Sequence, residues 1–269
     1  MYSINVQDDT GSNDELAGQI AHMLTDAAPY VEKATGLSLP ETVAVTLVGR
    51  EGLGTALGAF ARRQAERETE GMQLTATQQR SVDRMPMAAR TYTNHFWMIN
   101  ESHLIATSYG RPTTLLVPEA LEPQGLNTSD QLLDLLVRAL AEQAQVAACE
   151  GRLIPPQFFS ILQPWPYAVI ALSTGHACWT SNEVTPLILG RAVVRNQRPR
   201  PGAYLGRRLI GHLSSAREER RTRRAVTFVG QALATVGPDR FNQVWSVDGL
   251  VPTLVELRRP DQWAKRVPA

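Results

Sequence analysis

Apolar residues recur at helical spacing through most of the second half of the chain. The stretch from Asp130 to Cys149 has few polar residues, and similar periodicity continues over about 166–196 and 203–236. These stretches predict three long helices, because apolar residues three and four positions apart share one helix face. A kink is expected before Pro186, and two short helical pieces follow the third helix. The second half is therefore predicted to be almost entirely helical.

The first half of the chain mixes helical and strand-like patterns. Residues 14–36 have the apolar spacing of an amphipathic helix with Asn13 as its cap, and residues 41–49 alternate like a strand after Pro40. The stretch 64–90 is polar and predicts a mobile excursion from the core. Three further strands separated by short turns are predicted at 91–100, 103–108 and 113–118.

Strands early in the chain and helices late are typical of an α+β fold. We expect an N-terminal α/β part with a small sheet over residues 1–128 and a helical part over residues 129–269, integrated as one domain. The glycines of GREGLGTALG (49–58) do not follow the GxGxxG order, and a charged stretch comes next where a second parallel strand is needed. A turn and a helix to about Arg63 are predicted there, and no dinucleotide cofactor.

Composition and charge narrow the class of protein. A hydrophobic content of 43% with 20% charged residues is ordinary for a soluble globular protein, and a net charge of +1 gives no overall attraction to nucleic acid or anionic membrane. The polar N-terminus lacks the apolar core of a secretory signal, and the apolar runs are too short to span a bilayer. Cys149 and Cys178 make no disulfide framework. A cytoplasmic protein without a membrane partner is predicted.

One narrow polar line runs along the otherwise apolar helix predicted at 130–149. Asp134, Arg138, Glu142 and Gln145 fall at i, i+4, i+8 and i+11, so they share one side of the helix. Two interpretations stay open. The line is either the solvated face of the helix or the lining of an internal cleft.

The next predicted helix carries a matching polar line. Ser173, His176, Thr180 and Glu183 fall at i, i+3, i+7 and i+10 between apolar flanks. Two apolar helices with one polar line each are what a shared polar pocket requires. His176, with an ordinary pKa near 6.5, is a candidate general acid or base. The alternative is a hydrogen-bonded histidine of the core.

Four stretches resemble an actinobacterial family of zincin-like metallopeptidases. In zincins the active-site helix carries HExxH, which places two zinc-binding histidines one turn apart, and LLDLLVRALAEQAQVAA (132–148) resembles such a helix. LSTGHACW (172–179) is similar to a second helix of the family that contains a segment like EGHA. FNQVWSVDGLVPTLVELRRPDQWAKRVP (241–268) resembles the closing segment, and EKATGLSLPETVAVTLV (32–48) the stretch leading into the sheet. The resemblance implies a zincin-like fold.

The resemblance also implies that the zinc site is lost. Arg138 stands at the first histidine, Ala139 at the glutamate, Glu142 at the second histidine and Thr174 at the third ligand. Arginine stays protonated and cannot bind a cation, alanine cannot act as a base, and a lone carboxylate does not hold zinc. We therefore expect a degenerate HExxH helix, no metal and no cofactor.

These observations predict a repurposed cleft that binds or transforms a small polar or anionic metabolite. Arg138 would anchor a carboxylate or phosphate group, and Glu142 or His176 would move a proton. The resemblance suggests biosynthesis of specialised metabolites as the setting. The alternative from another class is a non-catalytic pseudopeptidase that works through a protein partner. The predicted ligand-binding residues are Arg138, Ser173, Thr174, Thr180 and Glu183.

An arginine-rich segment raises a third function. Eleven arginines lie between Arg191 and Arg224, a density that can contact phosphates. Glu218 and Glu219 interrupt the run, and only Tyr204 supplies an aromatic ring within it. The sequence therefore favours a solvated helix face with internal ion pairs, and it disfavours a nucleic-acid partner.

Overall fold

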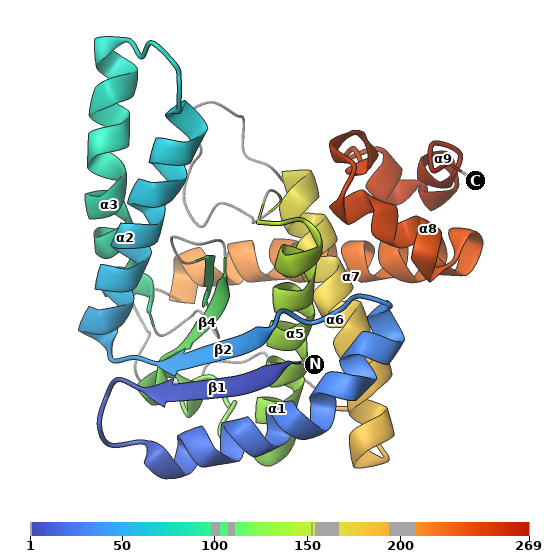
Figure 1. Ribbon diagram of the computed structural model, residues 1–269, viewed down its shortest axis with the longest axis horizontal. Helices are drawn as coiled ribbons and strands as arrows, with labels where there is room; N and C mark the ends of the chain where they lie inside the picture. Colours follow the sequence, from blue (N-terminus) through green and yellow to red (C-terminus); the bar gives the residue numbers. More distant parts are fainter. Residues whose placement is uncertain are drawn as a thin grey trace.

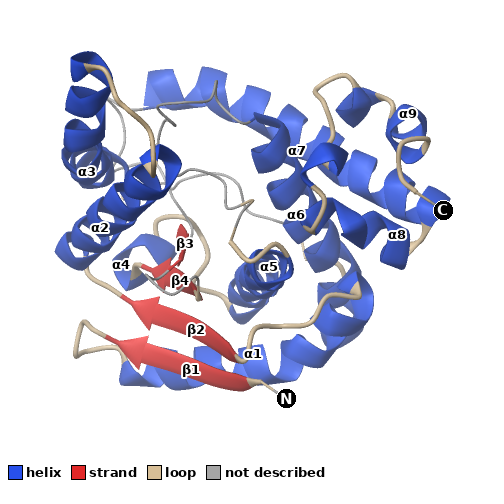
Figure 2. Ribbon diagram, turned by 45° about the horizontal axis from the view of Figure 1, so that its top comes forward, coloured by secondary structure: helices blue, strands red, loops and turns tan. Residues whose placement is uncertain are grey.

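The computed structural model describes residues 2–97, 103–106, 111–151, 153, 167–193 and 208–268. Its centre is a four-stranded sheet with helices packed around it (Figures 1 and 2). The α+β class and the mainly helical second half are confirmed. None of the helices described is long and apolar enough to cross a membrane.

The sheet has the strand order β1-β2-β4-β3. Strands β1 (Ser3–Asp8), β2 (Thr42–Leu47) and β4 (Pro112–Leu116) are parallel, and β3 (His103–Ala106) is antiparallel to β4 at the edge. The patterns at 41–49, 103–108 and 113–118 therefore correspond to strands. Strand β1 was not predicted, because it is an edge strand of alternating exposed and half-buried residues that is rich in polar side chains.

Helix α1 (Asp14–Thr35) confirms the amphipathic pattern at 14–36. The turn before it is built on Asp8, whose carboxylate accepts hydrogen bonds from the hydroxyl and N–H of Thr10 and from the N–H groups of Ser12 and Asn13. These bonds hold the pKa of Asp8 below its usual range. The helix ends at Gly36, whose φ of 65° is the left-handed conformation that glycine adopts without a steric cost.

Two predictions between β2 and β3 were wrong. The polar stretch 64–90 and the first part of the supposed strand 91–100 belong to a helical hairpin of α2 (Arg50–Thr69) and α3 (Ala76–Phe96), and residues 98–100 lie outside the described residues. The helix predicted to about Arg63 is the first part of α2. Thr75 and Gln78 make a capping box that starts α3. Residues 64–90 are mostly polar and few of them are buried, so the stretch shows no continuous apolar face. A Cβ on Gly58 would lie 3.2 Å from the Pro86 carbonyl oxygen, so this glycine permits close helix packing.

The hairpin lies on the opposite side of the view from the C-terminus in Figure 1. Its base packs onto the sheet through a small apolar cluster that joins α2 to β4 and to α4 (Pro118–Leu121). The members of this cluster are Val48, Leu53, Leu57, Phe60, Leu115, Val117 and Ala120.

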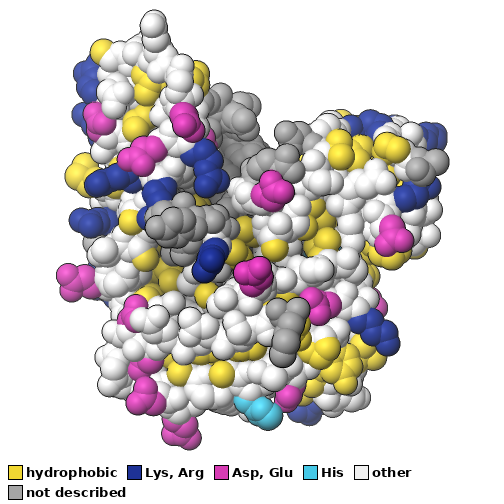
Figure 3. Space-filling model, in the orientation of Figure 1, with side chains coloured by type: hydrophobic (Ala, Val, Ile, Leu, Met, Phe, Trp, Pro, Cys, Tyr) yellow, Lys and Arg dark blue, Asp and Glu magenta, His cyan; other side chains and the backbone are white. Residues whose placement is uncertain are grey.

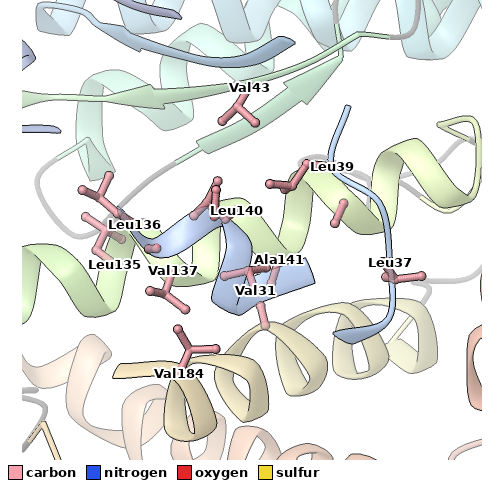
Figure 4. Close-up of a cluster of buried hydrophobic side chains, with 14 of the residues drawn as sticks. Val31, Leu37, Leu39, Val43, Leu135, Leu136, Val137, Leu140, Ala141 and Val184 are labelled. Atoms are coloured by element: carbon pink, nitrogen blue, oxygen red, sulfur yellow. The ribbon is translucent and has the colours of Figure 1, made fainter. Parts of the chain in front are cut away.

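Helix α5 (Ser129–Ala148) runs through the main core, as the pattern at 130–149 predicted. Figure 4 shows its apolar side chains between Val43 of β2 on one side and Val184 on the other. Val184 belongs to α6 (Tyr167–Leu189), which contains Pro186 near its end and packs in turn on α7 (Arg208–Val236). A helix enclosed by a sheet and other helices buries nearly every side, which explains its apolar composition.

Short elements close the chain beside α7 (Figure 1). They bury an aromatic cluster of Phe228, Phe241, Trp245 and Trp263, and the Trp263 indole N–H donates to the Leu250 carbonyl oxygen at 2.6 Å. The elements are α8 (Pro238–Asn242), the 3-10 turns η1 (Gln243–Trp245), η2 (Asp248–Leu250) and η3 (Glu256–Arg258), and α9 (Pro260–Ala264).

Candidate functional site

Gln143 fastens α5 to the sheet. Its amide accepts from the Ala44 N–H at 3.2 Å and donates to the Ala44 carbonyl oxygen at 2.8 Å and to the Thr114 hydroxyl at 3.0 Å. The side chain thus forms hydrogen bonds with both the N–H and the carbonyl oxygen of Ala44 in β2, as the backbone of a neighbouring strand would. It is fully buried. Because Gln143 points at the sheet, the polar line of α5 points elsewhere.

The ends of that polar line face α6. Near the start of α5, an Oδ of Asp134 accepts the Ser181 hydroxyl at 2.6 Å, and its other oxygen lies 3.2 Å from Nη2 of Arg138. Near the end of α5, the Gln145 side chain meets Ser173 and His176. We call this set of contacts between α5 and α6 the polar seam.

Gln145 organises the inner end of the polar seam. Its Oε1 accepts the Ser173 hydroxyl at 2.5 Å, so its Nε2 is the donor to Ser173 O at 3.2 Å and to Nδ1 of His176 at 2.9 Å. Nδ1 is therefore the acceptor nitrogen of His176, and the neutral ring carries its proton on Nε2. All three side chains are buried, so each depends on the others for its hydrogen bonds.

Aromatic rings enclose the imidazole of His176. The ring is stacked on Phe241 at a centroid distance of 5.8 Å and meets Trp245 edge-on at 5.3 Å and Trp179 at 6.0 Å. The side chain is 0% exposed, and burial lowers the pKa of His176 to about 3. His176 is thus neutral near pH 7. Its Nε2 has no hydrogen-bond partner among the residues that the structure describes.

The outer part of the polar seam reaches the surface at Arg138 and Glu142. The Arg138 side chain is 18% exposed, whereas that of the paired Asp134 is 2% exposed. Glu142 on α5 and Thr174 on α6 are half-buried. Here Arg138 lies on α5 between Asp134 and, one turn further along the helix, Glu142, both of which carry a carboxylate. The Arg138 guanidinium can bind a polar or anionic group.

The remaining predicted ligand-binding residues lie in different surroundings. Ser173 is part of the polar seam through Gln145. The Thr180 hydroxyl is buried and donates to the His176 carbonyl oxygen of its own helix at 2.8 Å, and Glu183 is exposed. Sequence reasoning did not assign Gln145 and Ser181 to the site. Gln145 belonged to the polar line of α5, but Ser181 lay one position beside the line of α6 and gave no signal.

Residues able to bind a metal are not grouped in the parts of the chain described. Among residues 2–97, 103–106, 111–151, 153, 167–193 and 208–268, no three or more His, Cys, Asp or Glu side chains lie together. Cys149 and Cys178 are both buried free thiols. Glu142 therefore belongs to no group of three or more such side chains among the described residues.

Comparison with known proteins informs the fold alone. No protein-family model and no curated protein matches the sequence. A crystal structure from Chloroflexus aurantiacus, described as a hydrolase candidate with a novel fold, superposes with a TM-score of 0.56 at 15% identity. The superposition covers 95% of this chain and 91% of that one, so the similarity extends over the whole architecture.

Proposed function

We propose that this chain is a zincin-like protein whose former active-site cleft binds a small polar or anionic molecule without zinc chemistry. The observation that carries the proposal is the pairing of Arg138 with the buried Asp134 at the outer end of the polar seam. The helix that resembles a zincin active-site helix is also the one fixed between the sheet and the C-terminal half. The resemblance supports specialised-metabolite biosynthesis as the setting.

The Arg138–Asp134 pair favours ligand binding over a purely structural role. Asp134 is itself held by the Ser181 hydroxyl, so the carboxylate that orients the guanidinium is fixed by two helices. A preorganised guanidinium loses less side-chain freedom when it binds an anion, and its planar fork matches carboxylate and phosphate groups. Burying a charged pair lowers the stability of the fold through desolvation, so stability does not explain why the pair is present. A binding role explains it better.

The proton-transfer role falls to Glu142 in this proposal. Glu142 is half-buried and lies one turn from Arg138 on α5, so the carboxylate can meet a neutral polar group of a molecule whose anionic group is bound by Arg138. His176 is enclosed by aromatic rings and has a pKa of about 3, so near pH 7 it is not the imidazolium acid, and its neutral ring is a weak base. We assign His176 to positioning α6 through Gln145.

A binding screen with paired charge variants tests this proposal. Small dicarboxylates and phosphate esters are screened by calorimetry against the parent chain and against the double variant Asp134→Asn, Arg138→Gln, which removes both charges and keeps a polar side chain at each position. We expect a ligand whose binding is lost in the double variant and weakened in Glu142→Gln. A ligand that binds the double variant as well as the parent would place its site elsewhere and refute the role of Arg138.

A non-catalytic pseudopeptidase that contacts a protein is the second candidate. The observation that favours it is on the helical hairpin, where Met87 is 65% exposed and Met72 is 48% exposed. Cross-linking in cells distinguishes the two functions. Under this second candidate, Met72→Gln with Met87→Gln removes a cross-linked partner, and the double charge variant at Asp134 and Arg138 retains it.

A further inference from the structure

An open groove lies between α7 and the C-terminal elements, away from the polar seam. Its volume is about 540 Å³, within the usual range of roughly 300–1,000 Å³ for small-molecule sites. One wall is α7 and the other is formed by η3 and the first residue of α9. The lining residues are Arg220, Arg223, Arg224, Thr227, Phe228, Gln231, Leu257, Arg258 and Pro260.

Four arginines from two elements meet along this groove. Arg220, Arg223 and Arg224 share one face of α7, because they are spaced by three and four residues, and Arg258 comes from η3 on the opposite wall. All four are exposed, and no acidic side chain is among the described lining residues. Figure 3 shows Lys and Arg side chains gathered on the outer edge of the C-terminal segment.

The walls of the groove are held rigidly. Phe228 is fully buried at its floor and packs edge-on against Trp263 of α9 at 5.5 Å. On the opposite wall, Nε and Nη2 of Arg266 donate to Glu256 at 2.6 and 3.0 Å, which fastens η3. Glu256, two residues before Arg258, is therefore already paired with another arginine. Arg258 is presented to the groove on a fixed turn rather than on a loose loop.

We propose that this groove binds a compact polyanion of the phosphate class, meaning a small molecule with two or more phosphate groups. Guanidinium groups form forked, charge-assisted hydrogen bonds with phosphate oxygens, and groups on two facing walls can hold two phosphates at once. Thr227 and Gln231 add neutral hydrogen-bonding groups along α7.

A small ligand fits this groove better than a nucleic-acid strand. Single-stranded nucleic acids are bound by aromatic side chains on which the bases stack, together with a long basic track. The one aromatic residue among the described lining residues is Phe228, which is fully buried and offers no exposed face. The groove therefore has the charge to bind phosphates but lacks a platform for bases.

Titration calorimetry of the full chain with sodium tripolyphosphate at low salt tests the proposal. We expect one binding site, weaker binding of inorganic phosphate, and an affinity that falls as salt is added. Arg258→Ala and Arg224→Ala should each weaken tripolyphosphate binding about tenfold, equivalent to about 1.4 kcal/mol. Arg259→Ala is the matched control, because Arg259 is exposed and adjacent to Arg258 but does not line the groove. Its effect should stay within about twofold.

Three results would overturn the proposal. The first is the absence of tripolyphosphate binding at low salt. The second is an equal loss of affinity in Arg259→Ala and Arg258→Ala, which would mean that net charge alone attracts the anion. The third is a single-stranded RNA that binds more tightly than tripolyphosphate and loses affinity with Arg224→Ala, which would assign the surface to nucleic acid. An unchanged thermal unfolding temperature shows that the fold of each variant is intact. If Arg258→Ala does not fold, the comparison of Arg224→Ala with the parent chain is sufficient to test the proposal.

Discussion

The polar seam and the arginine groove use polar residues in opposite ways. In the seam, Asp134, Gln145 and His176 are buried, and each has a specific partner on the facing helix. In the groove, charges of one sign lie exposed side by side. Burial makes an unpaired polar group expensive, whereas water screens exposed charges and lets them accumulate. Changes in the seam should therefore alter stability, and changes in the groove should alter binding.

The largest effect is expected from removing the cation of the buried pair. Arg138→Ala leaves the buried Asp134 with less charge compensation, so the free energy of unfolding should fall by about 3–5 kcal/mol. The double variant Asp134→Asn, Arg138→Gln should recover most of this loss, because no charge is left buried. Urea denaturation measures both values. A loss below about 0.5 kcal/mol for Arg138→Ala would class the pair with ordinary surface ion pairs.

The second prediction concerns pH and His176. The pKa of this residue is about 3 in the folded protein and about 6.5 in the unfolded chain, so the unfolded chain binds the proton first as pH falls. His176 therefore costs stability below about pH 6.5, by about 2 kcal/mol between pH 7 and pH 5. Denaturation at both pH values, compared between the parent and His176→Leu, isolates this contribution from those of the carboxylates. Equal pH dependence in the two proteins would contradict the buried neutral histidine.

The third prediction concerns the contact between α6 and α7. A Cβ on Gly175 would lie 2.7 Å from the Ala225 Cβ and 2.8 Å from its carbonyl carbon, so Gly175→Ala forces the helices apart. We expect a net loss of about 1–2 kcal/mol after the gain in helix propensity. Gly230→Ala is the control, because its Cβ would meet Trp179 at an ordinary 3.6 Å. Thermal unfolding should show the control equal to or more stable than the parent, and the reverse order would mean that the helices are spaced differently.

The smallest effect on stability is expected in the groove. Arg224→Ala removes an exposed charge from a surface where the neighbouring charges have the same sign, so the free energy of unfolding should change by less than about 0.5 kcal/mol. The same variant should weaken tripolyphosphate binding about tenfold, so a large effect on affinity accompanies a small effect on stability. A loss of stability comparable to that of Arg138→Ala would show that Arg224 contributes to the stability of the fold as the Arg138–Asp134 pair does.

The sequence by itself determined the elements with strong local patterns. Helices α1 and α5 and strand β2 were predicted close to their bounds, because burial on one face imposes a regular spacing of apolar residues. The first part of α2 was predicted as a helix to about Arg63, but the rest of α2 and all of α3 were missed, since residues 64–90 are mostly polar. The sequence also showed the polar lines of α5 and α6. It did not show whether those lines face the solvent or the interior of the protein.

Only the tertiary structure decided what those polar residues meet. Gln145 and His176 are 31 positions apart, and Asp134 and Ser181 are 47 apart, so no local spacing joins them. The burial that lowers the pKa of His176 comes from rings on three different segments of the chain. Likewise, Arg258 joins the arginines of α7 because Glu256 and Trp263 fix the C-terminal elements against that helix. Helical periodicity shows which residues share a face, but the packing of separate elements determines what that face contacts, because their contacts are set by distance in space.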